Sequence, residues 1–248
     1  MTTATSAPAL RFSGVTKKFP GGTTALADAD LEVSPGEFVA VVGPSGCGKS
    51  TLLRIASGLD DVSEGTVDVG AKQLGYVFQD ATLLPWRSVS ANVGLFAELD
   101  HLDKAERDRR VVDAIALVGL VGFEKHLPHE LSGGMRMRTS LARSLVLDPD
   151  VFLFDEPFGA LDEITRERLN DELLRMFAVR GFTALFVTHS VAEAVFLSTR
   201  VVVMSGRPGR VIADVPVPFA YPRSPELRYT PEYAARCGDV SRYLRNAS

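Results

Sequence analysis

Residues 38–58 restrict the fold of this chain more than any other segment. They run from an unbroken apolar stretch, FVAVV, through the glycine-rich sequence GPSGCGKS into TLLRIASGL. A short continuous apolar run is typical of a strand buried on both faces of a sheet. The segment after the glycines predicts a helix that stops at Gly58. A tight loop is therefore expected between a central strand and a helix.

The rest of the chain alternates strands and helices around this unit. Apolar residues at about every second position predict antiparallel strands across 10–33, with a turn at 20–22. A turn-rich segment follows the first helix. Further strands are expected at 74–78, 151–154 and 183–187, and helices at about 133–146 and 163–179. Such alternation predicts an α/β fold with a mainly parallel sheet that binds ligands at the carboxyl ends of its strands.

Residues 85–130 have a different character, with few β-branched runs and several helical patterns. The clearest spans 103–118, where Val111, Val112, Ile115 and Val118 recur at helical spacing. We predict a helical insertion at approximately 85–150 within a domain that spans 10–215.

The carboxyl-terminal part of the chain predicts three further features. Ser190 and Glu193 have the spacing of a capping box at a helix start. A hairpin is expected from strands at 200–204 and 210–215. The tail, 216–248, is rich in proline and leads to a helix capped at Thr230 with Pro231 at its first position.

Composition excludes several classes of protein. The chain has 248 residues, of which 46% are hydrophobic and 23% charged, values close to those of globular proteins. Two cysteines, Cys47 and Cys237, cannot build a disulfide framework. The net charge of −4 argues against a nucleic-acid binder. No signal-peptide pattern and no apolar run of membrane-spanning length are present, so we expect a cytoplasmic protein.

The loop sequence fits the phosphate-binding pattern G-x-x-x-x-G-K-[ST]. Its backbone N–H groups would converge on phosphate oxygens, Lys49 would bridge the β- and γ-phosphates, and Ser50 would hold Mg²⁺. A glycine-rich turn with a solvated lysine is the alternative, and the strand–loop–helix context argues against it. The predicted nucleotide contacts are Gly43, Pro44, Ser45, Gly46, Cys47, Gly48, Lys49, Ser50 and Thr51.

Polar residues follow three other predicted strands at the same sheet edge. The strand at 151–154 leads into two carboxylates, of which Asp155 would orient Mg²⁺ and Glu156 would polarise an attacking water. His189 follows another strand and could contact a γ-phosphate. Gln79 follows the strand at 74–78 and could reach Mg²⁺ or the water. The predicted catalytic set is therefore Glu156, His189 and Gln79, and the metal set is Ser50, Gln79 and Asp155.

The sequence LSGGM at 131–135 predicts a second anion site. Ser132 suits a helix N-cap, while Gly133 and Gly134 leave the next N–H groups uncovered by side chains. Read alone, the motif is an ordinary helix cap. A second anion site on a chain with one evident phosphate loop nevertheless requires an explanation.

These motifs, in this order and spacing and together with GALD at 159–162, resemble the nucleotide-binding subunit of ATP-binding-cassette transporters over about residues 10–215. The resemblance implies a fold with a mainly parallel sheet, an antiparallel β subdomain and an inserted helical subdomain. It also implies a head-to-tail homodimer, in which each ATP lies between one phosphate loop and the partner's LSGG helix. Phe19 would stack on adenine, and Asp162 would belong to a loop that connects the two sites.

Two positions depart from the common family pattern: Met135 replaces a glutamine and Gly159 replaces a serine. With the PGRV sequence at 208–211, they resemble bacterial importer ATPases for nitrate, sulfonates and taurine. The apolar segment 83–96 would then meet the membrane subunit. This resemblance implies ATP and Mg²⁺ as cofactors and an import role at the cytoplasmic face of the cell membrane, with permease subunits, an extracytoplasmic solute-binding protein and no nucleic acid.

Other functions for a cassette of this kind remain open in the sequence. A cassette ATPase that acts on DNA or ribosomes would be expected to have a long coiled coil or basic linkers, which this chain lacks. A regulatory module without catalysis is disfavoured because every catalytic position is filled. An exporter half-transporter would need fused membrane spans. The chain does not indicate which solute is transported.

Overall fold

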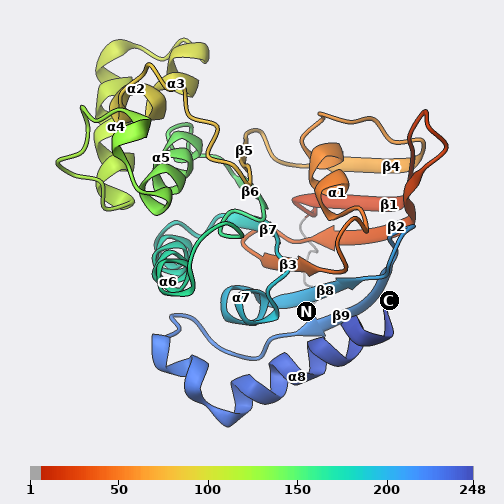
Figure 1. The fold of residues 1–248 in the computed structure, drawn as a ribbon. Helices are drawn as coiled ribbons and strands as arrows, with labels where there is room; N and C mark the ends of the chain where they lie inside the picture. The colour runs from red at the N-terminus through yellow and green to blue at the C-terminus, as the bar shows by residue number, and fades with distance from the viewer. Residues whose placement is uncertain (1–6, 248) are drawn as a thin grey trace, which may run out of the picture.

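The computed structural model of this protein describes residues 7–247 and is built around a six-stranded sheet (Figure 1). The strand order is β5-β6-β7-β3-β8-β9, and only β9 runs antiparallel to its neighbour. The mainly parallel α/β sheet predicted from the sequence is confirmed. Its strands are β3 (Phe38–Val42), β5 (Leu74–Val77), β6 (Val151–Asp155), β7 (Thr183–Val187), β8 (Arg200–Met204) and β9 (Val211–Pro216).

The central strand β3 is buried on both faces, as its unbroken apolar sequence predicts. Phe38, Ala40 and Val42 belong to a core shared with α6 (Glu163–Arg180) and α7 (Val191–Leu197). The alternate residues of β3 face a second core, which includes α1 (Lys49–Ala56). Because side chains alternate along a strand, one central strand anchors helices on both faces of the sheet.

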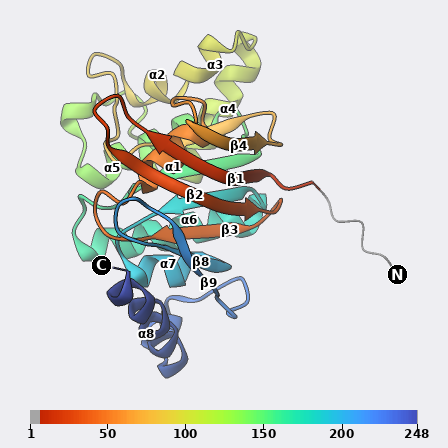
Figure 2. The ribbon, with the colours of Figure 1, turned by 90° about the vertical axis from the view of Figure 1, so that its right-hand side faces the viewer.

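A separate antiparallel sheet has the strand order β2-β1-β4, and its three strands lie side by side on one side of the molecule (Figure 2). Strands β1 (Leu10–Lys18) and β2 (Thr24–Val33) confirm the alternation at 10–33. Strand β4 (Glu64–Val69) lies in the segment that the sequence describes only as rich in turns, so this strand was not predicted. It is an edge strand whose residues are almost all exposed, and its two apolar residues, Val67 and Val69, make too short an alternation to identify a strand.

Helices occupy the segment between β5 and β6 and lie away from the antiparallel sheet (Figure 1). In α4 (Lys104–Leu117), Val111 and Ile115 are buried, as is Val118 directly after the helix. Val112 is exposed, because a stripe along one helix face does not include two consecutive residues. The assignment of a separate insertion at 85–150 within a domain at 10–215 stays a prediction. The helices are α2 (Val89–Val93), α3 (Leu95–Leu99), α4 (Lys104–Leu117), η1 (Pro128–Glu130) and α5 (Gly133–Leu145).

The tail forms η2 (Pro225–Tyr229) and α8 (Pro231–Asn246), which packs beside α7, β8 and β9 (Figure 1). Thr230 caps α8 by accepting a hydrogen bond from the Tyr233 N–H, which confirms the predicted cap. None of the helices within the described residues 7–247 is long and apolar enough to cross a membrane.

The predicted capping box of α7 is only half formed. The Ser190 hydroxyl accepts from the Glu193 N–H at 3.3 Å, as expected. The Glu193 carboxylate, however, accepts a hydrogen bond from the Thr188 hydroxyl instead of returning to the Ser190 N–H. Thr188 Oγ1 itself accepts from that N–H at 3.0 Å. A neighbouring hydroxyl therefore replaces the direct contact.

Candidate nucleotide-binding site

The glycine-rich loop joins the carboxyl end of β3 to the first residue of α1. Gly48, the residue before α1, has φ +104°, and a Cβ there would lie 2.8 Å from the Ala25 carbonyl oxygen. Only glycine combines this backbone conformation with such close contact. No side chain caps α1. The first N–H groups of the helix are therefore available to an anion, and the positive end of the helix dipole favours one.

Lys49 is buried at the base of this loop. Its ammonium group donates to the carbonyl oxygens of Gly43 at 2.9 Å and Pro44 at 3.2 Å. The same nitrogen lies 3.9 Å from a Glu156 carboxylate oxygen. The lysine is therefore held against the loop, with its charge close to the acidic residue predicted to take part in catalysis.

Asp155, the last residue of β6, accepts two hydrogen bonds from side chains on other elements. The Ser50 hydroxyl donates to Oδ1 at 2.8 Å, and the Tyr76 hydroxyl donates to Oδ2 at 3.2 Å. Burial raises the pKa of Asp155, and these two hydrogen bonds oppose that shift. Two hard oxygen ligands, a hydroxyl and a carboxylate, lie side by side here, so the residues present fit the chemistry that Mg²⁺ requires.

Glu156 directly follows β6 and has φ +47°, an uncommon backbone conformation for a residue with a side chain. Its second carboxylate oxygen lies 3.2 Å from Nδ1 of His189. The structure thus places Glu156 between Lys49 and His189. A Cβ on Gly159 would lie 3.4 Å from the His189 ring, so the glycine found in place of a serine leaves space beside this pair.

An open pocket with a volume of about 410 Å³ extends from the loop towards the turn between β1 and β2. Phe19, an exposed residue of that turn, lines the pocket, and its stacking on adenine, which the family resemblance implies, stays a prediction. The described residues that line the pocket are Phe19, Thr23, Ala25, Ser45, Gly46, Gly48, Lys49, Ser50, Thr51, Glu156 and Arg207.

Gln79 lies two residues beyond β5, the strand next to β6, with an exposed side chain. Within the described residues it is not among those lining the pocket. Among the described residues, contacts link Glu156 to His189 and Ser50 to Asp155, and none links Gln79 to either pair. Its predicted metal and catalytic roles remain predictions.

The LSGGM segment forms the start of α5. The Ser132 hydroxyl accepts from the Met135 N–H at 3.3 Å, and Ser132 and Gly133 are exposed. A Cβ on Gly134 would lie 2.9 Å from a Thr165 methyl group, so the second glycine allows α5 to pack closely on α6. None of the described residues lining the nucleotide pocket comes from 131–135. One copy of the chain therefore exposes its second predicted anion site away from its first.

Sequence reasoning missed two side chains near the phosphate loop. Tyr76 lies on β5, and nothing in the neighbouring sequence indicates that its hydroxyl donates a hydrogen bond to Asp155. Arg207 donates from Nε to the Gly46 carbonyl at 3.0 Å and lines the pocket. The PGRV sequence drew attention to this hairpin, but only as a family resemblance.

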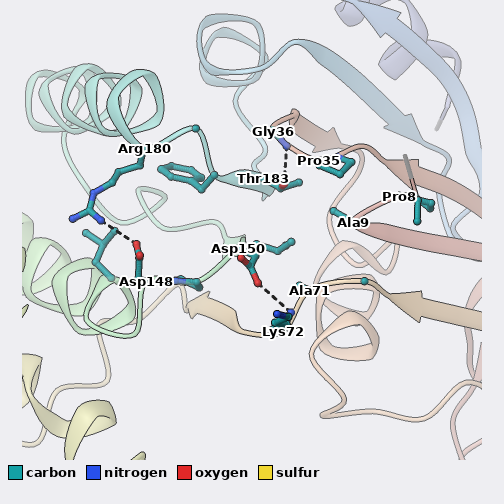
Figure 3. A pocket seen from close by; sticks show the side chains of 17 residues that line it. Pro8, Ala9, Pro35, Gly36, Ala71, Lys72, Asp148, Asp150, Arg180 and Thr183 are labelled. Carbon is teal, nitrogen blue, oxygen red and sulfur yellow. Dashed lines mark hydrogen bonds and ion pairs between the residues drawn. The ribbon is translucent and has the colours of Figure 1, made fainter. Parts of the chain in front are cut away.

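A second pocket lies at the opposite, amino-terminal edge of the parallel sheet (Figure 3). Asp150 accepts from the Lys72 N–H at 3.1 Å, and Arg180 forms an ion pair with Asp148 at 2.9 Å. Arg180 and Asp148 therefore neutralise each other, Asp150 is bound by a backbone N–H, and no glycine-rich loop opens into this pocket. The carboxyl-terminal edge, not this one, has the features of a phosphate site.

A phosphate loop between a central parallel strand and a helix, a carboxylate pair after the neighbouring strand, and an antiparallel sheet beside the loop define a nucleotide-binding α/β protein of the cassette type. The family model described as "ABC transporter" matches residues 26–159. The chain belongs to the ABC transporter ATP-binding family and is an ATPase of that type.

Relatives with similar sequences cover most of the chain. A putative ATP-binding protein of Brucella abortus is 42% identical over 92% of this chain and 90% of its own length. An aliphatic sulfonates import ATP-binding protein, SsuB, of Bacillus cereus is 42% identical over 84% of each chain.

Solved structures agree with the fold. A dimeric bacterial ABC transporter cassette has a TM-score of 0.76 at 30% identity and covers 85% of this chain and 100% of its own. A dimeric cassette in a post-hydrolysis state, bound to ADP and Pi, has a TM-score of 0.75 at 30% identity, with the same coverage. The structure named cbiO1 from Clostridium perfringens, part of the cbiONQ complex, has a TM-score of 0.79 at 26% identity and covers 97% of each chain.

Proposed function

We propose that this chain is the ATP-hydrolysing subunit of an importer for a small solute of the nitrate, sulfonate or taurine type, acting at the cytoplasmic face of the cell membrane. The observation that carries the catalytic part is the position of Glu156, with one carboxylate oxygen near Lys49 and the other near His189 at the mouth of the phosphate loop. The sulfonate-import relatives at 42% identity support the solute class.

In this proposal, the residues around the loop divide the work of phosphoryl transfer. The loop 43–51 holds the phosphates, and Lys49 exchanges its carbonyl partners for phosphate oxygens. Glu156 accepts the proton of a water that attacks the γ-phosphorus as the bond to the bridging oxygen of ADP breaks. Lys49 and His189 stabilise the charge on the transferred group. Phe19 stacks on the adenine ring.

Ser50 and Asp155 are the residues that would hold Mg²⁺, with Gln79 as a third contact. Bound there, the ion would neutralise phosphate charge and fix the geometry of the phosphate chain. The Ser50 hydroxyl at present donates to the Asp155 carboxylate, so both oxygens already face the same space.

The second part of the proposal is a head-to-tail homodimer. Ser132 and Gly133 are exposed and lie outside the pocket of their own chain, so the start of α5 is free to meet the γ-phosphate held by a partner. The dimeric cassettes among the solved relatives support this arrangement. Because ATP would contact both chains only in the closed state, ATP binding would favour closure and hydrolysis would favour opening.

Membrane permease subunits and an extracytoplasmic solute-binding protein would complete the transporter. Within 83–96, Val89, Asn92 and Val93 are fully buried inside the helical segment, whereas Trp86 is 73% exposed. A large exposed aromatic residue in the segment that follows Gln79 is suited to bind a permease helix. Association with DNA or ribosomes is the alternative, and no observation favours it.

The decisive experiment uses Glu156→Gln. This variant should keep ATP binding and lose turnover by about 100-fold or more. It should accumulate an ATP-bound dimer, because the ATP that holds the two chains together is no longer hydrolysed. Phosphate release measures turnover, and light scattering after gel filtration measures the dimer. Glu163→Gln, an exposed acid at the start of α6, is the matched control and should behave like the unmodified protein.

Adding Ser132→Arg to Glu156→Gln should abolish the dimer and leave nucleotide binding intact, since the arginine would occupy the site that meets the partner's phosphate. Unchanged turnover in Glu156→Gln would refute the general-base role. An ATP-dependent dimer of the double variant would refute the shared site.

A further inference from the structure

The hairpin between β8 and β9 carries an arginine that enters the nucleotide pocket. Arg207 donates from Nε to the carbonyl oxygen of Gly46, in the middle of the phosphate loop, at 3.0 Å. A Cβ on Gly46 would lie 2.9 Å from an Nη atom of the same guanidinium. The group therefore lies directly against the loop, in the same pocket as Lys49 and Thr51.

The hairpin turn itself is held firmly in place on three sides. The Gly209 N–H donates to Ala25 at 2.9 Å, and the Gly209 carbonyl accepts from Ala27 at 3.0 Å, which joins the turn to β2. A Cβ on Gly209 would lie 1.9 Å from the Cys47 carbonyl oxygen, so the turn rests on the loop. The Gly206 N–H donates to Ala247 at the end of α8. Arg207 therefore projects from a well-ordered base.

The charge of Arg207 has no acidic partner within the part of the chain that the structure describes, since none of the ion pairs there includes it. Arg200, on the strand that leads into the hairpin, instead pairs with both Glu37 and Asp214. A guanidinium has five N–H donors, and the bond to Gly46 uses one. A cation with open donors beside a phosphate loop is suited to bind a phosphate oxygen.

We propose that Arg207 is a nucleotide-binding residue whose guanidinium contacts the phosphate groups of a nucleoside di- or triphosphate held by the loop. This inference rests on the proposed function, because it takes the phosphate loop as the nucleotide site. Arg207 adds a second cation beside Lys49, contributed by the carboxyl-terminal half of the chain. In this way the hairpin, seated between β2 and α8, closes one wall of the pocket.

The test measures the Kd of a fluorescent ADP analogue, so that dimer closure by ATP does not contribute. Arg207→Ala should weaken ADP binding about tenfold, and Arg207→Lys by less, because the charge is kept without the planar fork. Arg210→Ala is the matched control, because it lies on the same hairpin, is exposed, and contributes to the turn only through its backbone. It should leave the Kd unchanged.

Salt distinguishes contact with phosphate from a purely structural effect on the loop. The loss caused by Arg207→Ala should be larger at about 0.05 M than at about 0.5 M KCl, because salt screens exposed charges. Equal losses at both concentrations, or a Kd like that of the unmodified protein, would overturn the inference. Lys49→Ala separates failure of the proposed nucleotide site from failure of the Arg207 contact. If Lys49→Ala also binds ADP normally, the proposed site itself is wrong. If only Lys49→Ala loses ADP binding, the role of Arg207 alone is refuted.

Discussion

Replacing Arg223 should destabilise the protein strongly, although this residue lies in the proline-rich tail and outside every predicted site. Its guanidinium is buried and donates five hydrogen bonds to four backbone carbonyls. Two of these carbonyls, those of Val195 and Phe196, lie in the last turn of α7, the helix that follows His189. Arg223 therefore completes the end of a helix beside the nucleotide site.

The size of the expected loss of stability depends on which backbone carbonyls at this helix end have other partners. The Thr199 N–H, which would continue the helix by bonding to Val195, donates instead to Phe38 of β3. Arg223 Nη1 satisfies both Val195 and Phe196, at 3.1 and 2.7 Å. Leaving a buried acceptor unsatisfied costs about 1–3 kcal/mol. Without Arg223, the carbonyls of Val195 and Phe196 would both be unsatisfied, while the protein would no longer pay to bury the guanidinium charge. The net cost is about 2–5 kcal/mol.

Urea unfolding followed by circular dichroism measures this effect in the nucleotide-free protein. Arg223→Ala should lower the free energy of unfolding by about 3 kcal/mol, and Arg223→Lys should restore little of it, because one ammonium group cannot reach the same carbonyls. Arg242→Ala on α8 is the control, since this exposed arginine pairs only with Asp239, and its loss should stay within about 0.5 kcal/mol. A loss below about 1 kcal/mol for Arg223→Ala would refute the reasoning.

Two further predictions concern the phosphate loop. Lys49→Ala should weaken ATP binding about tenfold or more, as expected when a charged hydrogen-bonding partner is removed, and equilibrium binding of a fluorescent ATP analogue measures it; an unchanged Kd would mean that the loop is not the site. Burial raises the pKa of the Cys47 thiol, so at neutral pH it holds less reactive thiolate than a free cysteine. It should therefore be alkylated more slowly than free cysteine, with the rate rising towards alkaline pH, and mass spectrometry after timed iodoacetamide treatment checks this. Fast alkylation of native Cys47 at neutral pH would contradict it.

Local chemistry explains why much of the fold and the loop could be predicted. Strand β3 can be predicted because a strand buried on both faces needs an unbroken apolar run. The phosphate loop can be predicted because its sharp turns need glycines at fixed positions, including Gly48 with its positive φ. The cap at Thr230 depends on an N–H three residues away. In each case the residues that decide the structure are neighbours in the chain.

Strand β4 shows where such signals fail. Its residues are mostly exposed and only Val67 and Val69 are apolar, so the alternation in Glu64–Val69 is too short to predict a strand. Pairing with β1 makes the segment a strand. Position 65 requires glycine, because a Cβ there would lie 2.4 Å from the Gly14 carbonyl oxygen of β1, a close approach that no local pattern reveals. An edge strand of this kind is defined by its neighbour rather than by its own sequence.

The sequence by itself determined the class of protein, the phosphate loop and the residues predicted to act on phosphate. Only the tertiary structure decided how those residues meet, because the contacts join distant parts of the chain: Tyr76 and Asp155 are 79 residues apart, and Arg207 and Gly46 are 161 apart. It also assigned the tail a packing role, through Arg223 and the end of α7. Spacing along a chain encodes helices, strands and turns, whereas a contact between distant segments depends on how the whole sheet brings its edges together.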